Sequence, residues 1–364
     1  MVALSDLSAQ HGSDASASRL RKRKASQFRL QAYGILAITL AGLALVVLMS
    51  TVITQASRAM TESYVTLDVM LDPAEIDPDN TGDPTIIGRF NYDGLVKDML
   101  KAEFPNATGR TQRRELYDVV SSGAQFELRQ RVIDDPSLLG QTIPVQLLAS
   151  DVTDLYLKGD FGRLRPQEHS GDLSVIATEE EGVVQVLTSA NDFAGALARV
   201  KTQLGRQAEF LRRQAELQDR GVRVFTSRAE ATDDAEAKRE LEVQATSRAT
   251  ERDRLIGEAE DLEARASQAG GRETLDRGGP SVLLQVNGGW IKMTEIDATG
   301  GVGTSIRAVE PGDAIPPTEW SYYLHDLPEE SRKVSDNQIV WIESLDRTGK
   351  VESVFNNRFF SAGD

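Results

Sequence analysis

A run of 22 consecutive uncharged residues near the start of the sequence, residues 32–53, most constrains how this chain can fold. At about 1.5 Å of rise per helical residue, the run covers about 33 Å and matches the roughly 30 Å hydrocarbon core of a bilayer. A cleaved secretory signal has a shorter apolar region and a small-residue A-x-A site, and residues 54–58 contain no such site. A buried core helix is the third alternative. We predict an uncleaved transmembrane helix over residues 32–55.

The charges on either side of this segment predict its orientation. Residues 1–31 contain six basic and two acidic side chains, whereas the other flank has only Arg58 before Glu62. The positive-inside rule therefore places a basic tail, residues 1–31, in the cytoplasm and the bulk of the chain on the opposite side of the membrane. The start of the tail, residues 1–18, is polar and aperiodic, and we expect it to be disordered. The residues that determine this topology are Arg19, Arg21, Lys22, Arg23, Lys24 and Arg29.

The chain beyond the tail is strongly acidic. The whole sequence has a formal net charge of −15 and residues 1–31 contribute +4, which leaves −19 on residues 32–364. Such a surface offers no basic face to nucleic acid, and it repels small anions unless a local pocket overrides the mean field. The sequence has no cysteine, which excludes disulfides, thiolate nucleophiles and cysteine-ligated metals. The roughly 310 residues outside the membrane predict one or two ordinary domains.

Short strands and amphipathic helices are expected over residues 60–190 and predict an α+β region. Residues 64–71 alternate apolar and polar side chains like a half-buried strand, and a turn-rich stretch follows. A helix is expected to begin at Asn91 or Asp93, to stop at Pro105 and to pack on that strand. Three further helices and two short strands are predicted at residues 111–122, 125–134, 151–158, 173–177 and 183–187.

Residues 191–269 have the composition of long exposed helices, rich in Ala, Arg, Glu, Gln and Leu and without proline. Apolar residues recur in a seven-residue frame, which predicts an antiparallel coiled-coil hairpin with arms at residues 191–220 and 228–269. Residues 221–226 interrupt the frame and are expected to break the helix. The mixed charges favour a solvated surface, with a partner-docking tip near residues 219–236 as the alternative. The frame consists of Leu197, Val200, Leu204, Leu211, Leu241, Ala245, Leu255, Ala259, Leu262 and Ala266.

Residues 270–364 are β-rich and are expected to complete the domain that residues 60–190 begin. The sequence Asn287-Gly288-Gly289 between apolar runs predicts a β-hairpin. Strands are expected at residues 281–286, 290–296, 302–309, 338–345 and 350–355. Because a helical hairpin returns the chain to where it left, the economical topology is one domain with the hairpin inserted. The predicted fold is α+β, with a single N-terminal transmembrane helix followed by an extracytoplasmic domain that contains the antiparallel coiled coil.

Two motif-like segments do not meet the requirements of the sites they suggest. The D-x-D-x-T-G segment at residues 77–82 resembles a calcium loop, but the twelfth position is Gly88 instead of a bidentate glutamate, so we expect an Asx and proline turn. Residues 300–305 lack the lysine of a phosphate-binding loop, and we expect a flexible β-turn there. We predict no enzyme activity, no catalytic residue, no cofactor and no metal.

The three histidines, His11, His169 and His325, show no metal-ligand spacing. His325 lies near Asp326 and the aromatic residues of the segment 320–323. A pocket with a His/Asp pair is one interpretation. A surface aromatic cluster is the interpretation that we favour.

Basic residues gather at two places on the outer part of the chain. Arg110, Arg113 and Arg114 form the denser group, and Arg163 and Arg165 form the other. An anion site is one interpretation of each group. Solvated helix ends are the favoured interpretation, and the sequence does not identify ligand-binding residues.

Several segments of the sequence are similar to those of a known family. They are the basic tail with its span, residues 64–78 (YVTLDVMLDPAEIDP), residues 114–142, and the closing stretches WSYYLHDLPEESRKVSDNQIVWIESL and VFNNRFFSAGD. In these segments the chain resembles the N-terminal extension, itself of unknown function, of PstA, a permease subunit of the bacterial phosphate ABC transporter, in its alphaproteobacterial type. The resemblance covers most of residues 20–364 and is strongest outside the hairpin.

The resemblance implies a place in the bacterial inner membrane, with the N-terminus cytoplasmic and the bulk periplasmic. The partners it implies are a second permease subunit, an ATPase and a periplasmic phosphate-binding protein. The multi-span permease core does not occur in this sequence, so we expect a truncated permease or a split reading frame, with a stand-alone extension as the alternative. The expected function is to support inorganic phosphate import through an accessory or partner-docking periplasmic domain.

Two other functions are less favoured by the sequence. A periplasmic adaptor of an efflux or secretion system would share the single span, the hairpin and the flanking strands. It would also need those strands to form matched lipoyl-like halves, whereas a helical region of about 70 residues precedes the hairpin here. An extracytoplasmic sensor is less favoured, because the 31 residues before the span contain no signalling module.

Overall fold

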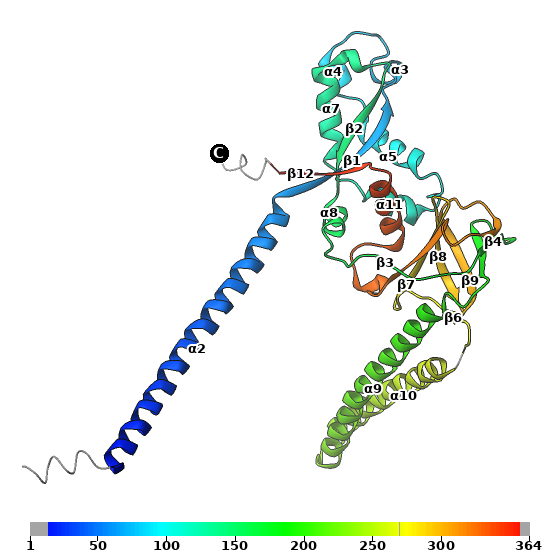
Figure 1. Ribbon diagram of the computed structural model, residues 1–364. Coiled ribbons are helices and arrows are strands. Elements are labelled where there is room, and N and C mark those ends of the chain that lie inside the picture. Colours follow the sequence, from blue (N-terminus) through cyan, green and yellow to red (C-terminus); the bar gives the residue numbers. More distant parts are fainter. Residues whose placement is uncertain (1–13, 269, 357–364) are drawn as a thin grey trace, which may run out of the picture. The chain divides into compact units, whose positions relative to one another are not determined.

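The computed structural model describes residues 14–268 and 270–356 and divides into two units, which are described separately. The first unit contains the long helix α2 (Asp14–Ala59), drawn in blue in Figure 1. Within the described residues, the segment Gln27–Thr54 of α2 is the one helix long and apolar enough to cross a membrane. The predicted span therefore lies in a helix. The expected disorder of residues 1–18 is wrong from Asp14 onward, because α2 begins there.

Three hydroxyls in α2 are satisfied within the helix itself. The side chains of Thr39, Thr51 and Thr54 each donate to a backbone carbonyl four residues earlier. The side chains of residues 27–54 are otherwise exposed in the isolated chain. A polar group that bonds its own helix needs no water, so these threonines are compatible with an apolar surrounding.

The second unit begins with a three-stranded sheet in which β1 (Thr61–Met70) lies between β12 (Val351–Phe355) and β2 (Thr142–Leu148). β1 and β2 run antiparallel, with Leu67 opposite Val145. Alternate apolar side chains of both strands are buried against short helices, as the period of two requires. These helices are α3 (Pro73–Ile76), α4 (Pro84–Ile87), α5 (Tyr92–Glu103), α6 (Arg110–Tyr117), α7 (Ala124–Asp134), η1 (Pro136–Leu138) and α8 (Asp151–Leu157).

Most of the predictions for this part are confirmed. The strand expected at residues 64–71 is β1, and Asn91 caps α5 by accepting from the backbone N–H of Gly94. The helices expected at 125–134 and 151–158 are α7 and α8, whereas the helix expected at 111–122 is shorter and ends at Tyr117. Strand β2 was not predicted, although its apolar residues alternate.

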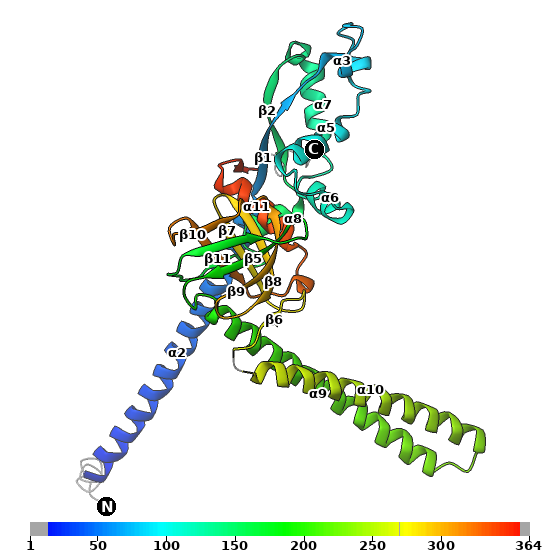
Figure 2. The same cartoon turned by 90° about the vertical axis from the view of Figure 1, so that its right-hand side faces the viewer.

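A nine-stranded sheet forms the other part of the second unit (Figure 2). Its strands follow the order β10-β4-β5-β9-β8-β7-β11-β3, and β6 pairs with β8. The expected strands at 173–177, 183–187, 281–286 and 290–296 are all present. The strands are β3 (Arg165–Pro166), β4 (Leu173–Ala177), β5 (Val183–Thr188), β6 (Glu273–Thr274), β7 (Ser281–Val286), β8 (Gly289–Ile296), β9 (Gly300–Arg307), β10 (Gly312–Ile315) and β11 (Trp320–His325).

The helical hairpin is an insertion into this sheet. It consists of α9 (Ala194–Glu230) and α10 (Ala235–Ser267), and strands of the same sheet precede and follow it. Phe193, Ala196 and Leu197 at its base are buried in the core of the sheet. The predicted insertion of an antiparallel hairpin is therefore confirmed. Its interhelical seam contains small buried residues at seven-residue multiples, namely Ala208, Ala215 and Ala229 on α9 and Ala245 and Ala259 on α10.

The helix break expected at residues 221–226 is wrong, because α9 continues through this stretch to Glu230. A Cβ atom on Gly221 would lie 2.7 Å from the Cδ atom of Arg248 on α10. The glycine therefore makes room for the arginine that interrupts the apolar frame of the second arm. The guanidinium of Arg248 lies 5.3 Å from the ring centroid of Phe225. The turn lies further along, where Asp234 caps α10 by accepting from the N–H groups of the first helical turn.

The strand expected at residues 338–345 is also wrong, because these residues belong to α11 (Asp336–Arg347). Ser335 accepts from the backbone N–H of Gln338, and the Gln338 side chain accepts from the backbone N–H of Ser335. This reciprocal capping box starts the helix. The continuous run Ile-Val-Trp-Ile imitates a buried strand because α11 is buried almost all round, so its apolar residues show no helical period.

The flexible turn expected at residues 300–305 is wrong as well, since these residues form strand β9 in the middle of the large sheet. A Cβ atom on Gly300 would lie 2.0 Å from the carbonyl oxygen of Val186, and one on Gly301 would lie 1.9 Å from that of Glu295. The glycines are therefore required by the close approach of neighbouring backbone, not by a turn.

The glycines of β9 and of the hairpin predict opposite effects of added methyl groups. We expect Gly300→Ala to destabilise the protein by roughly 1–3 kcal/mol or more, because the new Cβ overlaps a backbone atom that cannot move alone. Gly257→Ala on α10 is the matched control, since nothing lies within 4 Å of its new Cβ. That change is expected to stabilise the helix by about 0.5–1 kcal/mol. Denaturant unfolding of the purified chain in detergent measures both, and equal effects would contradict the packing described for β9.

Candidate functional site

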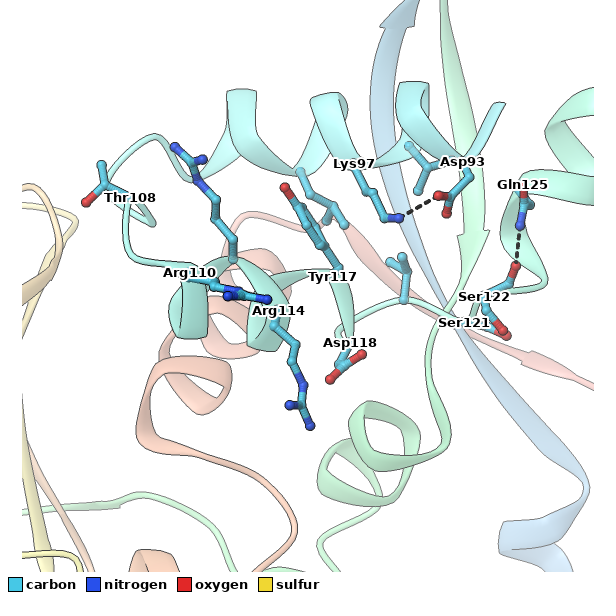
Figure 3. Close-up of a pocket in the computed structure, with 14 residues that line it drawn as sticks. Asp93, Lys97, Thr108, Arg110, Arg114, Tyr117, Asp118, Ser121, Ser122 and Gln125 are labelled. Carbon is cyan, nitrogen blue, oxygen red and sulfur yellow. Dashed lines mark hydrogen bonds and ion pairs between the residues drawn. The ribbon is translucent and has the colours of Figure 1, made fainter. Parts of the chain in front are cut away.

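A pocket of about 660 Å³ lies beside α6 (Figure 3). Its walls come from α5, from α6, and from residues 118–125, which run from the end of α6 into the start of α7. The N-terminal end of α6 follows Gly109, whose backbone N–H donates to the side-chain oxygen of Gln112. Six charged side chains line the pocket, namely Asp93, Lys97, Arg110, Arg113, Arg114 and Asp118.

The two charged side chains on the α5 side of the pocket neutralise each other. Lys97 lies four residues after Asp93, and its Nζ atom is 2.5 Å from the Asp93 carboxylate. The same ammonium lies 5.5 Å from the centroid of the Tyr117 ring. These contacts fix the lysine over the aromatic floor of the pocket and leave little free charge on this side.

The α6 side contains the arginines that the sequence singled out. Arg113 donates from Nε to the carbonyl oxygen of Ala107 at 3.3 Å. The side chains of Arg110 and Arg114 make no hydrogen bond or ion pair with any residue that the structure describes. All three are exposed, in agreement with the favoured interpretation of solvated helix positions. The structure adds that they share one pocket.

The second basic group does not join this pocket. Arg163 donates to the carbonyl oxygen of Leu157 at 3.1 Å. Arg165 pairs with Asp326 at 3.0 Å, and the same carboxylate lies 3.3 Å from Arg199 on α9. These arginines are therefore used in local structural contacts.

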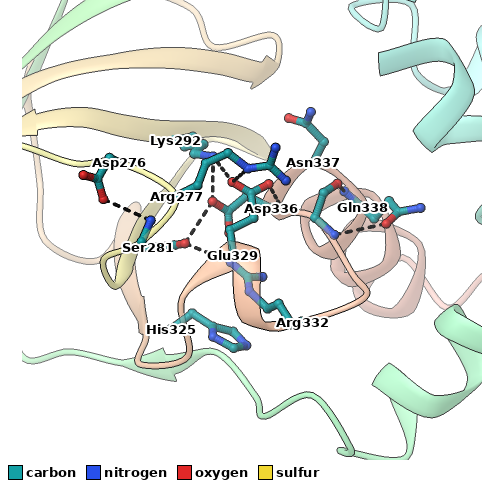
Figure 4. A network of polar contacts seen from close by, with 12 residues as sticks. Asp276, Arg277, Ser281, Lys292, His325, Glu329, Arg332, Asp336, Asn337 and Gln338 are labelled. Carbon is teal, nitrogen blue, oxygen red and sulfur yellow. Dashed lines mark hydrogen bonds and ion pairs between the residues drawn. The ribbon is translucent and has the colours of Figure 1, made fainter. Parts of the chain in front are cut away.

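A buried ionic network lies where β7, β8 and α11 meet (Figure 4). Asp336, which is 1% exposed, accepts from Lys292 at 2.7 Å and from the hydroxyl of Ser281 at 2.9 Å. Arg332 donates to the other oxygen of the same carboxylate. Every oxygen of Asp336 thus has a charged or hydroxyl partner, as a buried carboxylate requires.

Glu329, in the short helix η2 (Glu329–Ser331), is the second buried carboxylate of this network. Its Oε2 atom lies 2.9 Å from Lys292 and 3.3 Å from Arg277, and its Oε1 atom accepts from the backbone N–H of Asp336 at 3.1 Å. Three cations therefore face two carboxylates. The network has one positive charge in excess.

The electrostatics of the network follow from this geometry. Burial alone would raise the pKa of Asp336, but Arg332 and Lys292 outweigh burial and hold the pKa below its ordinary value. Burial alone would lower the pKa of Lys292, but Asp336 and Glu329 outweigh it and keep this pKa above its ordinary value. Both groups are charged at neutral pH.

Sequence reasoning missed this network because it assigned α11 to a strand. The signals were nevertheless present. Ser335 and Gln338 have the spacing of a capping box, and Arg332 and Asp336 are separated by four residues. Read together, they would have indicated a helix start with a charged residue at its first position.

His325 belongs to the buried strand β11 and is 1% exposed. Its Nδ1 atom lies 3.2 Å from the carbonyl oxygen of Leu327. Burial, and then the neighbouring Arg332, lower the pKa of His325. The His/Asp pair does not form, because Asp326 pairs with arginines instead.

The aromatic residues around His325 are not on the surface. Trp320 and Tyr322 are each 2% exposed and pack in the core of the large sheet, so the predicted surface cluster is wrong. The cause is the central position of β11 between β7 and β3. His169 packs on Trp320, with ring centroids 4.1 Å apart, and has a structural role there. His11 lies outside the described residues.

The D-x-D-x-T-G segment is a turn, as predicted. The Asp77 carboxylate accepts from the hydroxyl of Thr81 at 2.9 Å and from the backbone N–H of Gly82 at 2.7 Å. Its oxygens therefore serve the loop itself. Within the described part of the chain, no group of three or more His, Asp or Glu side chains is placed to hold a metal ion.

The hairpin carries a row of exposed apolar residues on α9. Phe210, Leu217 and Val224 are separated by seven residues and are 55%, 50% and 48% exposed. Seven residues are close to two helical turns, so these side chains share one face of the helix. We call this face the α9 stripe. It is distinct from the alanine seam, which is buried against α10.

The residues expected to set the membrane orientation lie in the N-terminal part of α2. The side chains of Arg19, Arg21, Lys22, Arg23 and Lys24 lie outside the described residues, although their backbone is helical. Arg29 is exposed. The sidedness that these residues suggest therefore stays a prediction from the sequence.

One comparison with known proteins gives a match. Residues 17–167, less than half of the chain, match the model of a domain of unknown function (DUF3333). The matched region covers most of α2, the strands β1 and β2, and the short helices α3 to α8 with the α6 arginines. It ends before the hairpin. No curated protein and no solved structure matches the chain.

The buried network predicts a specific dependence of stability on pH. Replacing Asp336 with asparagine leaves Arg332 and Lys292 without their shared carboxylate, and we expect a loss of about 3–5 kcal/mol at pH 7. The pKa of Asp336 is lowered by folding, so its contribution is complete above about pH 4, the usual aspartate value, and is lost as the pH falls through the folded pKa.

The measurement is the free energy of unfolding of wild type and Asp336→Asn between pH 3 and pH 8. The difference between the two proteins should shrink below about pH 4 and stay level above it. Asp313→Asn provides a control, since Asp313 lies at the exposed edge strand β10. A difference that grows toward acid pH would contradict the assigned charges.

Proposed function

We propose that this chain is the membrane-anchored N-terminal part of a phosphate ABC transporter permease subunit and supports import of inorganic phosphate. The proposal takes the helix segment Gln27–Thr54 as an inner-membrane anchor with the second unit in the periplasm. What supports the transporter assignment is the resemblance of the sequence segments to the PstA extension. The matched domain has no known function, so it supports a shared domain and not a shared activity.

The observation that supports an accessory, partner-docking role is the α9 stripe. Exposed apolar side chains at regular spacing on a long helix form an unusual surface, because solvated helices normally place charged residues there. Phe210, Leu217 and Val224 provide anchors of the kind that helix-mediated contacts use. We infer that this face meets another subunit of the transporter, either the second permease subunit or the phosphate-binding protein.

The hairpin is built to present that surface. Its base is fixed in the core of the large sheet by Phe193, Ala196 and Leu197. Ion pairs between the arms, such as Arg212 with Glu263 at 2.5 Å, hold the arms together near the stripe. The stripe is therefore displayed on a supported helix pair, which lowers the entropic cost of docking.

The adaptor function remains the second candidate, because an anchor and a hairpin inserted between strands are also its features. The arrangement of the sheet favours the first proposal. Strands β3 to β5 precede the hairpin and β6 to β11 follow it, and all belong to one sheet. Matched halves of equal strand content on the two sides of the hairpin are not formed by the described residues.

Substitutions on the α9 stripe test the docking role. We expect Phe210→Glu combined with Leu217→Glu to lower phosphate uptake under phosphate limitation at least several-fold, because two charges would enter an apolar contact. Both positions are exposed, so the hairpin itself should remain folded. Radiolabelled phosphate uptake by cells with the altered chromosomal gene measures the effect, and co-purification of the transporter subunits measures the contact.

Val243→Glu is the matched control, since Val243 is 68% exposed on α10 and lies outside the stripe. This variant should keep both uptake and co-purification. Removal of residues 191–269 should act at least as strongly as the double change. Unchanged uptake and unchanged co-purification in both the double variant and the deletion would refute the docking role.

A further inference from the structure

A second pocket, of about 560 Å³, adjoins the one in Figure 3 and shares Arg110, Arg114 and Asp118 with it. Its opposite wall is the segment that leads into α11, including Arg332, Lys333 and the helix cap. A volume in this range accommodates a small ligand. We call it the α6–α11 pocket.

The acidic side chains of this pocket are mostly occupied by protein partners. Glu115 on α6 accepts from the hydroxyl of Ser335 at 3.0 Å and from the side-chain amide of Asn337 at 2.9 Å. Glu329 is held by Lys292 and Arg277 in the buried network. Their negative charges are therefore used to fix the walls.

The basic side chains are mostly unoccupied. The side chains of Arg110, Arg114 and Lys333 make no hydrogen bond or ion pair with any residue that the structure describes. One carboxylate of the pocket, that of Asp118, is unpaired in the same sense. The side chain of Arg332 is fully buried, yet its Nε and Nη1 atoms have no hydrogen-bond partner among the described residues. Because both atoms are buried, Arg332 contributes positive charge to this wall and not a donor to the open pocket.

We propose that the α6–α11 pocket binds a phosphate-type oxyanion. Arginine guanidinium groups match the geometry of phosphate oxygens by donating two parallel hydrogen bonds. Arg110 and Arg114 stand on one helix, and Lys333 faces them from the other wall. Together with the excess positive charge of the buried network, they make a local positive site on a chain of net charge −15. This inference does not depend on the transporter role.

The same chemistry could come from free inorganic phosphate or from the phosphate group of an anionic lipid. Two arms of one experiment distinguish them, both with the full chain in neutral detergent or vesicles. Calorimetric titration with inorganic phosphate at low ionic strength tests the first source. Co-sedimentation with vesicles of phosphatidylglycerol, against vesicles of phosphatidylcholine, tests the second.

We expect saturable binding in at least one arm and an affinity at least tenfold weaker for the Arg110→Gln/Arg114→Gln variant. Both positions are exposed, so folding should be unaffected. Arg113→Gln combined with Arg239→Gln is the control, because it removes the same charge from residues that do not line the α6–α11 pocket. Equal weakening by both double variants would mean a diffuse field and would overturn the proposal, as would the absence of saturable binding in both arms.

Discussion

The carboxylate of Asp336 is the contact on which the second unit depends. It accepts a hydrogen bond from Ser281 on β7 and forms an ion pair with Lys292 on β8, and Asp336 is itself the first residue of α11. The opposite side of α11 places Trp341 against Phe104 of the helical part, with ring centroids 6.0 Å apart. One helix thereby joins the nine-stranded sheet to the part built on β1 and β2, and apolar residues of both parts form one continuous core.

Burying a carboxylate in this position costs free energy unless both of its oxygens are paired. Asp336 therefore constrains which residues can surround it. Arg332 and Lys292 balance the negative charge of Asp336, and Ser281 donates a further hydrogen bond to one of its oxygens. Glu115 provides a second contact between the two parts, because it lies on α6 and accepts hydrogen bonds from Ser335 and Asn337 at the start of α11. Glu115, Glu329 and Asp336 therefore act as structural groups. Among the described residues that line the α6–α11 pocket, the charged side chains left unpaired are Arg110, Arg114, Asp118 and Lys333.

The sequence predicted elements well where their periodicity is local. The hairpin was found because its seven-residue frame repeats, and most of that frame, such as Leu204, Leu255 and Ala259, is buried. Helix α11 was assigned to a strand because burial on all sides removes the period that distinguishes the two. The role of Gly221 and that of Gly300 depend on neighbours that are distant in sequence, and no local pattern contains that information.

The candidate site was predictable only in part, for a related reason. Arg110, Arg113 and Arg114 are visible as a basic group in the sequence, but their unpaired state depends on what the fold places opposite them. The buried network joins residues 277, 281, 292, 329, 332 and 336, which lie on β7, β8, η2, α11 and the loops beside them. Charge composition alone gave the opposite expectation, since the domain is acidic as a whole.

The alanine seam of the hairpin has a mechanical consequence. Small residues let α9 and α10 approach closely, and at about 1.5 Å per residue the 37 residues of α9 make an arm about 55 Å long. Because the arm is rooted in the sheet core at Phe193, a force applied at its far end acts on the sheet as through a lever. Adding or removing seven residues in each helix would change the reach by about 10 Å and keep the seam in register. The length of this arm can therefore change in heptad steps while the domain that holds it stays the same.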